Sequence, residues 1–179
     1  MLKDGTHGTH IDVDDGGVYL LSAKNIKYGK VCIDSSDRRI SEDEYNHIHK
    51  NYSLHKGDVL LTIVGSIGET AIIENSTKMT FQRSVAFLRP SEKIDSQFLF
   101  SLINTPYFQK QLQSKQVTSA QPGIYLGQLE NIPIKFPIIS EQQKIGVYFR
   151  QLDELIAQHG TLVQKLKQIK TACLEKMFV

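Results

Sequence analysis

The sequence lacks any apolar run long enough to cross a membrane, and it has only two cysteines among its 179 residues. A membrane-spanning helix needs about 20 consecutive apolar residues. The opening segment, MLKDGTHGTHIDVDDGG, also lacks the apolar centre of a signal peptide. Cys32 and Cys173 lie far apart and outline no disulfide framework. These absences predict a cytoplasmic protein without a membrane partner.

Recognisable catalytic motifs are missing as well. Gly65-Ser66-Ile67-Gly68 is neither the Gly-x-Ser-x-Gly of a nucleophile elbow nor a phosphate-binding loop ending in Lys-Ser/Thr. The sequence has no methyltransferase motif that combines a glycine-rich cofactor loop with Asn-Pro-Pro-Tyr. His7 and His10 precede several aspartates, but they sit in a glycine loop rather than on one helical face, so we assign no metal. We therefore predict a protein without catalytic activity of its own.

What the sequence does contain predicts an α+β body over residues 1–139. Short apolar runs between polar turns predict strands at 18–23, 30–34, 59–64, 70–74 and 80–89. Helices are expected at 41–50, capped by Ser41, and at 96–116, either as one helix or as two meeting at Thr105-Pro106. A short turn is expected at 126–131, and 132–139 should be extended. Cys32 lies within an expected strand, which predicts a small buried core residue.

Residues 140–179 predict one long helix. Ser140 and Gln143 have the spacing of a capping box at its start. Apolar residues then recur at alternating spacings of three and four, which is typical of a coiled-coil seam. The seam consists of Ile145, Tyr148, Leu152, Leu155, His159, Leu162, Leu166, Ile169 and Cys173. A helix of about 55–60 Å needs a long partner, and the chain offers no second one, so we predict a homodimer through this helix.

At this point several blocks resemble a known family. The runs KGDVLLTIVGSIGETAII, FQRSVAFLRP, IPIKFPIISEQQKIGVYFRQLDELI and LKQIKTACLEKMF follow one another as in the DNA-specificity subunit of type I restriction-modification enzymes. Any one block alone is weak evidence for the family, but the order and spacing of the blocks together are specific to it. The opening DGTHGTH also resembles the start of a target recognition domain in this family.

The resemblance implies two target recognition domains in a full-length subunit, each followed by a long helix, with the helices packed antiparallel as a spacer. This chain has one of each, so we expect a half-sized subunit or a C-terminal half. The resemblance also implies a strand leading into DGTHGTH, which we expect this chain to lack. It further implies double-stranded DNA, a methyltransferase (modification) subunit and a restriction/translocase subunit as partners. S-adenosylmethionine, ATP and Mg are expected only on those partners, and no cofactor here.

The residues themselves suggest where DNA is contacted. Phosphates are bound by cations, polar side chains and backbone amides, while bases are read by directed side chains in a groove. Polar and basic residues gather in the expected loops and turns, and Gln82 and Arg83 should lie on a strand with their side chains on opposite faces. The candidates are Thr6, His7, Thr9, His10, Lys24, Lys27, Lys30, Arg38, Arg39, Ser66, Gln82, Arg83, Ser119 and Gln121. Many surface lysines are merely solvated, so only part of this set is expected to contact DNA.

Two function classes stay open from the sequence. One is a non-catalytic DNA-specificity subunit that reads half of a split site. The other is a helix-mediated protein interaction module without DNA binding. The net charge of +2 does not separate them, whereas salt-dependent binding to duplex DNA would, because phosphate neutralisation gives a steep dependence on salt.

Overall fold

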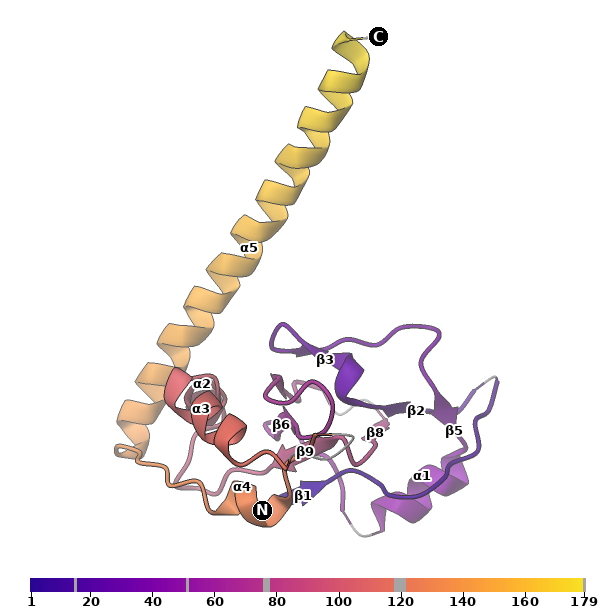
Figure 1. Ribbon diagram of the computed structural model, residues 1–179, viewed down its shortest axis with the longest axis vertical. Helices are drawn as coiled ribbons and strands as arrows, with labels where there is room; N and C mark the ends of the chain where they lie inside the picture. Colours follow the sequence, from indigo (N-terminus) through magenta and orange to yellow (C-terminus); the bar gives the residue numbers. More distant parts are fainter. Residues whose placement is uncertain (15, 51, 76–77, 118–121, 179) are drawn as a thin grey trace.

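One long helix extends well beyond the rest of the chain in the computed structural model, which describes residues 1–14, 16–50, 52–75, 78–117 and 122–178 (Figure 1). The other elements form a body at the base of this helix. The α+β class expected from the sequence is confirmed. None of the helices in these described ranges is long and apolar enough to cross a bilayer.

The described strands form three sheets. The largest is antiparallel, in the order β1 (Leu2–Asp4), β9 (Val85–Leu88), β6 (Val59–Thr62) and β7 (Thr70–Ile72). The second has the order β5 (Arg39–Ile40), β2 (Val18–Leu21) and β8 (Met79–Phe81), with β2 antiparallel to β5 and parallel to β8. The third is a hairpin of β3 (Ile26–Lys27) and β4 (Lys30–Val31), entered through the 3₁₀ turn η1 (Ala23–Asn25).

The helices follow the sequence signals closely. They are α1 (Glu42–His49), α2 (Ser96–Ile103), α3 (Pro106–Ser114), α4 (Leu126–Glu130) and α5 (Ile139–Met177). Ser41 caps α1 as predicted, with its side chain accepting from the Glu44 N–H. Thr105 caps α3, so the two-helix alternative at Thr105-Pro106 is confirmed. In Figure 1, α2 and α3 lie at the base of α5, and α1 lies at the far end of the body.

The core has two main parts that share β6. Val59 and Leu61 point into a cluster with α2, α3 and α4, whereas Leu60 points into a cluster with residues of β2, β8 and β9. Successive side chains of a strand face opposite sides, so β6 is buried on both faces. This is why its sequence is a continuous apolar run rather than an alternating one.

Four expectations about local structure are wrong. Residues 80–89 form two strands in different sheets, because the Gly5 and Thr6 N–H groups donate to Val85 and Phe81 and the Thr6 carbonyl accepts from the Arg83 N–H between the two strands. Residues 2–4 do supply a strand leading into DGTHGTH, paired with β9. Cys32 is exposed, because β4 ends at Val31. The long helix begins at Ile139 after the N-cap Ile138, which makes no side-chain cap, so Ser140 lies inside the first turn.

Gln142 fixes the start of the long helix. Its side chain is 0% exposed. The side-chain oxygen accepts from the Asp95 N–H at 3.0 Å, and the side-chain nitrogen donates to the carbonyls of Lys93 at 2.9 Å and Pro137 at 2.8 Å. One amide thus joins the segment before α2, the segment before α5 and α5 itself. This tertiary contact, rather than a capping box, fixes the N-terminal end of α5.

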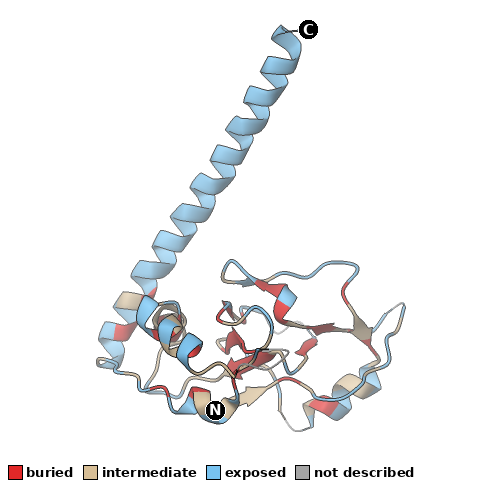
Figure 2. Ribbon diagram, viewed as in Figure 1, coloured by how far each residue is buried: buried red, intermediate tan, exposed pale blue. Residues whose placement is uncertain are grey.

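Gly146 brings α5 into close contact with α2, one turn after Gln142. A Cβ at this position would lie 2.7 Å from the Gln97 Cβ and 2.9 Å from the Phe98 N, closer than atoms pack. Glycine in a helix costs about 0.5–1 kcal/mol relative to alanine, which close packing offsets here. Beyond Gly146, every described residue of α5 is exposed (Figure 2).

We predict that Gln142→Glu destabilises the body by about 1–3 kcal/mol, because a carboxylate cannot donate to the two carbonyls and is itself buried. The neighbouring Gln143→Glu adds the same charge at an exposed position and should leave stability nearly unchanged. Urea denaturation followed by circular dichroism measures both. Equal midpoints for the two variants would show that Gln142 does not anchor the helix.

Candidate nucleic-acid interface

A hollow of about 390 Å³ brings together three of the predicted DNA-contacting residues. Thr6 follows β1, while Gln82 and Arg83 lie in the turn between β8 and β9. Among the described residues, Gly8, Val64 and Ser84 also line it. Gln82 and Arg83 are therefore not strand residues with opposed side chains, as the sequence suggested. Gln82 forms only an isolated bridge with Thr6, and Arg83 lies in the turn after it; Arg83 is exposed while Gln82 is half-buried.

The backbone of the first loop builds one wall of this hollow. The Gly5 N–H donates to the Val85 carbonyl at 2.9 Å, the Thr6 N–H donates to Phe81 at 2.7 Å, and the Arg83 N–H donates back to Thr6 at 3.0 Å. A Cβ on Gly5 would lie 2.1 Å from the Phe81 oxygen. Glycine at position 5 is thus required by a close approach of two backbones, which fixes the turn carrying Gln82 and Arg83.

The Gly65–Gly68 turn lies next to this hollow through Val64. Ser66 is exposed at its tip, and both Gly65 (φ 84°) and Gly68 (φ 101°) adopt left-handed backbone conformations. The buried Thr62 holds the turn: its hydroxyl donates to the Ser66 carbonyl and accepts from the Glu69 N–H at 2.9 Å. Two further candidates, Ser119 and Gln121, lie outside the described residues.

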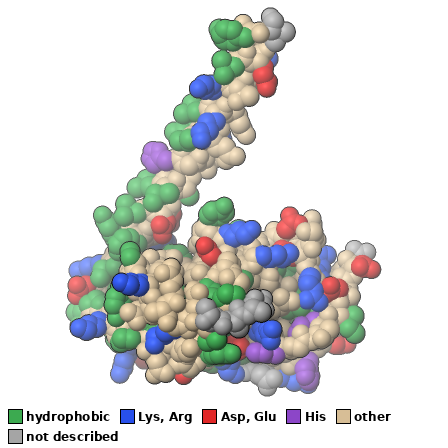
Figure 3. Space-filling view, in the orientation of Figure 1, with side chains coloured by type: hydrophobic (Ala, Val, Ile, Leu, Met, Phe, Trp, Pro, Cys, Tyr) green, Lys and Arg blue, Asp and Glu red, His purple; other side chains and the backbone are tan. Residues whose placement is uncertain are grey.

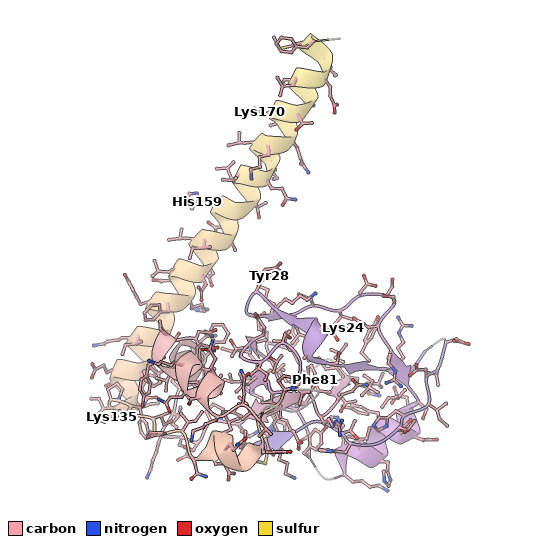
Figure 4. All side chains as sticks on the ribbon, in the orientation of Figure 1. Lys24, Tyr28, Phe81, Lys135, His159 and Lys170 are labelled. Atoms are coloured by element: carbon pink, nitrogen blue, oxygen red, sulfur yellow. The ribbon has the colours of Figure 1, made fainter. Side chains whose placement is uncertain are left out.

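Lys24, Lys27 and Lys30 lie on a second feature, the β3–β4 hairpin and the turn before it. Lys27 and Lys30 are exposed and pair across the hairpin. The Ala23 N–H donates to the Ser84 hydroxyl at 3.1 Å, so the base of this feature is joined to the lining of the hollow. Figure 3 shows Lys and Arg side chains along the upper edge of the body, and Figure 4 places Lys24 there.

Asp37 stabilises the base of the hairpin. Its buried carboxylate lies 2.7 Å from the Lys24 ammonium, accepts from the Asn25 amide at 2.7 Å and accepts from the Asp34 N–H at 2.8 Å. Burial alone raises the pKa of Asp37, but the hydrogen bonds from these three groups outweigh it and hold the pKa below its usual 3.8. Lys24 is therefore engaged in an ion pair.

The remaining candidates do not join the hollow or the hairpin. His7 lies 2.7 Å from Asp4, and His10 lies 2.6 Å from Glu44. Thr9 is exposed in the loop between them.

Arg38 and Arg39 are also bound within the body. The Arg38 Nε donates to Asp12 at 2.7 Å, and a second nitrogen donates to the His10 carbonyl at 2.9 Å. The Arg39 guanidinium lies 4.7 Å from the centre of the Tyr19 ring and donates to its hydroxyl at 2.8 Å. Part of the positive charge that the sequence offers for DNA is thus used in holding 10–14 and β5 against the body.

Sequence reasoning missed several residues of this interface. Ser84 and Val64 line the hollow, and Asn25 and Asp37 support the hairpin. No local signal marks these four, since their roles come from pairing between distant segments. In the part of the chain that the structure describes, no three potential metal ligands come together.

Solved structures share this arrangement of body and helix. The chain aligns over 99% of its length with the S subunit of a type I restriction-modification system from M. genitalium, with a TM-score of 0.62 and 16% identity, covering 43% of that chain. The HsdS subunit from Thermoanaerobacter tengcongensis aligns with a TM-score of 0.62 and 18% identity, and the alignment covers 99% of this chain and 41% of that one. A chain from a structure on complex assembly and conformational transition of the type I R-M system aligns with a TM-score of 0.67 and 17% identity. This alignment covers 98% of this chain and 42% of that one. The chain thus shares its fold with a little under half of a type I specificity subunit.

Sequence comparison then gives the family. The model of the type I restriction modification DNA specificity domain matches residues 12–168, and the chain belongs to this family. The specificity subunit of the type I restriction enzyme MjaVIII from Methanocaldococcus jannaschii is 28% identical over 161 residues, which are 87% of this chain and 37% of the relative. The EcoBI specificity subunit from Escherichia coli is 28% identical over 172 residues, 93% and 36% respectively. The chain spans little more than a third of these relatives.

We predict that Asp37→Asn lowers stability at pH 7 by about 1–3 kcal/mol, because the ion pair with Lys24 is lost. A lowered folded-state pKa stabilises the fold above the usual value, and this contribution disappears as pH falls from 3.8 through the folded pKa. The difference between wild type and variant, measured by urea denaturation, should shrink over that window. Asp12→Asn, at an exposed ion pair, should cost at most about 1 kcal/mol, and a pH-independent difference for Asp37→Asn would contradict the assignment.

Proposed function

We propose that this chain is a non-catalytic DNA-specificity subunit that reads one half of a split target. The observation that carries the proposal is the convergence of Thr6, Gln82 and Arg83 on one hollow in a member of the DNA specificity domain family. Arginine and glutamine are the side chains that form paired hydrogen bonds with guanine and adenine in the major groove. A threonine hydroxyl and the nearby turn amides suit phosphate contacts.

The position of Arg83 favours base reading over a structural role. Its side chain is exposed, while its backbone N–H is tied to Thr6 at 3.0 Å. A side chain on a fixed turn is pre-oriented, so less conformational entropy is lost on binding. This distinguishes it from Arg38 and Arg39, whose guanidinium groups are already bonded within the body.

Chemistry on the DNA is then assigned to other subunits. The two relatives described above are specificity subunits of restriction enzymes, and one similar structure concerns assembly of the type I system. By this likeness, a methyltransferase subunit and a restriction/translocase subunit dock on this chain and supply S-adenosylmethionine, ATP and Mg chemistry in the cytoplasm.

The long helix provides the surface for assembly. The seam residues Tyr148, Leu152, Leu155, Leu162, Leu166 and Ile169 are 36–59% exposed. Figure 3 shows hydrophobic side chains along one edge of α5. An uncovered apolar stripe of this length is costly in water. An antiparallel homodimer would cover both seams at once, with its two-fold axis near His159 and the two DNA-reading bodies at opposite ends.

A second stripe widens the apolar face of α5. Phe149, Ile156 and Val163 recur every seven residues beside the seam, and they are 46–69% exposed. A two-helix coiled coil needs only the seam positions, whereas helices in larger bundles carry a third apolar position. The extra width fits docking of helices from a partner subunit onto the paired rod.

The first test is salt-dependent binding of the purified chain to duplex DNA, measured by fluorescence anisotropy. A negative slope of log affinity against log salt is expected. Arg83→Ala should weaken binding to the preferred sequence by about 1–3 kcal/mol. Lys135→Ala removes an exposed cation on the opposite side of the body from Tyr28 (Figure 4) and should have little effect. Salt-independent binding, or none, would favour the protein-interaction alternative.

The helix is tested separately. The double variant Leu155→Glu/Leu162→Glu should be monomeric in sedimentation at tens of micromolar, because two charges enter each seam. Ala157→Glu/Gln164→Glu adds the same charges on the opposite face of α5 and should stay dimeric. An unmodified chain that sediments as a monomer would mean that the helix waits for a partner subunit.

The direction of pairing has its own readout in Cys173. A parallel pair would bring the two thiols together on the seam, so oxidation would cross-link the dimer. An antiparallel pair centred on His159 separates them by about 42 Å, from 28 residues at 1.5 Å each. We expect no cross-link.

A further inference from the structure

The tip of the β3–β4 hairpin carries a tyrosine in an unfavourable place. Tyr28 is 91% exposed, with a φ of 55°, and it is the only non-glycine residue with positive φ in the described part of the chain. Gly29 follows at φ 75°, and Lys27 pairs with Lys30. Positive φ at both central residues is the requirement of a two-residue type I′ turn.

The fold gains nothing evident from the tyrosine ring. Type I′ turns prefer Asn-Gly, because asparagine tolerates the left-handed region and a bulky side chain there is strained. The ring is also almost fully in water, so it adds no buried apolar area. Strain of this kind persists at functional positions when the surrounding structure holds it in place.

The base of the hairpin does hold it. Ile26 is fully buried. The Asn25 side-chain amide donates to the Cys32 carbonyl at 3.0 Å and to Asp37 at 2.7 Å. A Cβ on Gly29 would lie 3.2 Å from the Phe100 ring, so the turn rests against α2. The tip is therefore a fixed projection rather than a loose loop.

The surroundings of the ring match a polyanion. Exposed Lys27 and Lys30 flank it, and Figure 4 shows Tyr28 at the upper edge of the body, pointing into the open space beside α5. The hairpin base is also bonded to Ser84 in the lining of the hollow at 3.1 Å. An aromatic ring between two cations can meet bases while the cations meet phosphates.

We propose that Tyr28 is a base-contacting residue: its ring enters a groove of duplex DNA while Lys27 and Lys30 bind the flanking phosphates. The inference rests on the proposed DNA-reading function, and it adds a second contact element beside the Thr6–Gln82–Arg83 hollow. The hairpin fixes where the ring enters, because its backbone is held from both sides.

The turn chemistry gives an unusual test. Tyr28→Asn should leave the chain as stable as wild type or more so, because asparagine suits the left-handed conformation. The same variant should bind duplex DNA about tenfold more weakly, with the slope of log affinity against log salt unchanged. Tyr107→Asn removes another exposed tyrosine, on α3, and should not change affinity. Lys27→Gln and Lys30→Gln should each lower the salt slope by about one.

The absence of tryptophan from the chain allows a direct readout. The Tyr28→Trp variant carries one indole at the tip, whose fluorescence should change on saturation with a duplex because the ring leaves water and lies against base edges in the groove. The Tyr107→Trp variant is the matched reporter and should not respond. Anisotropy on the labelled duplex confirms saturation in both cases.

The outcomes separate this inference from the proposed function. If wild type binds duplex DNA, yet Tyr28→Asn binds as tightly and the Tyr28→Trp fluorescence is unchanged at saturation, the assignment of Tyr28 is overturned and the function stands. If wild type binds no duplex in any salt, the proposed function itself fails and the base contact with it.

Discussion

The packing of α5 on α2 is the constraint on which the rest of the structure depends. Gln142 satisfies three backbone groups, two in the segment before α2 and one in the segment before α5, and Gly146 lets the two helices approach until a methyl group would not fit. Because α2 also packs against β6 and the core cluster around Ile103, the direction of the long helix is set by the body. The rod is thus joined to the same core cluster that Val64, in the lining of the candidate DNA-contacting hollow, packs against.

Electrostatics divides the cations into two groups with different roles. Arg38, Arg39 and Lys24 are engaged by Asp12, Tyr19 and Asp37, and these contacts hold loops against the sheets. Arg83 projects from a turn, and Lys27 and Lys30 project from the paired strands of the hairpin; the backbone is hydrogen-bonded at all three positions. A charged side chain that is already bonded within the protein would have to break that contact in order to bind a phosphate. In the proposed complex with DNA, the projecting group would bind phosphates without that loss.

The sequence predicted those features that follow from local patterns. The long helix, the Ser41 cap, the α2–α3 break at Thr105 and the buried run of β6 were all readable from periodicity and turn chemistry. Features that are set by contacts between distant segments could not be predicted in this way. The break at Gln82–Ser84 depends on hydrogen bonds from Gly5 and Thr6, which lie near the start of the chain. The start of α5 depends on the hydrogen bond between Asp95 and Gln142. Of the candidate site, Thr6, Gln82 and Arg83 converge, whereas His7, His10, Arg38 and Arg39 bond elsewhere, which residue type alone does not reveal.

The projecting rod also acts as a lever. From Gly146 to Met177 it extends about 47 Å at 1.5 Å per residue. A tilt of about 4° at the anchor therefore displaces the far end by about 3.3 Å, close to the step of about 3.4 Å between successive base pairs. In a paired rod carrying a body at each end, angular stiffness at Gln142 and Gly146 would limit how accurately the distance between two half-sites is measured. In such a pair, the stiffness of the α5–α2 contact at these two residues would be as important for target choice as the side chains that contact the bases.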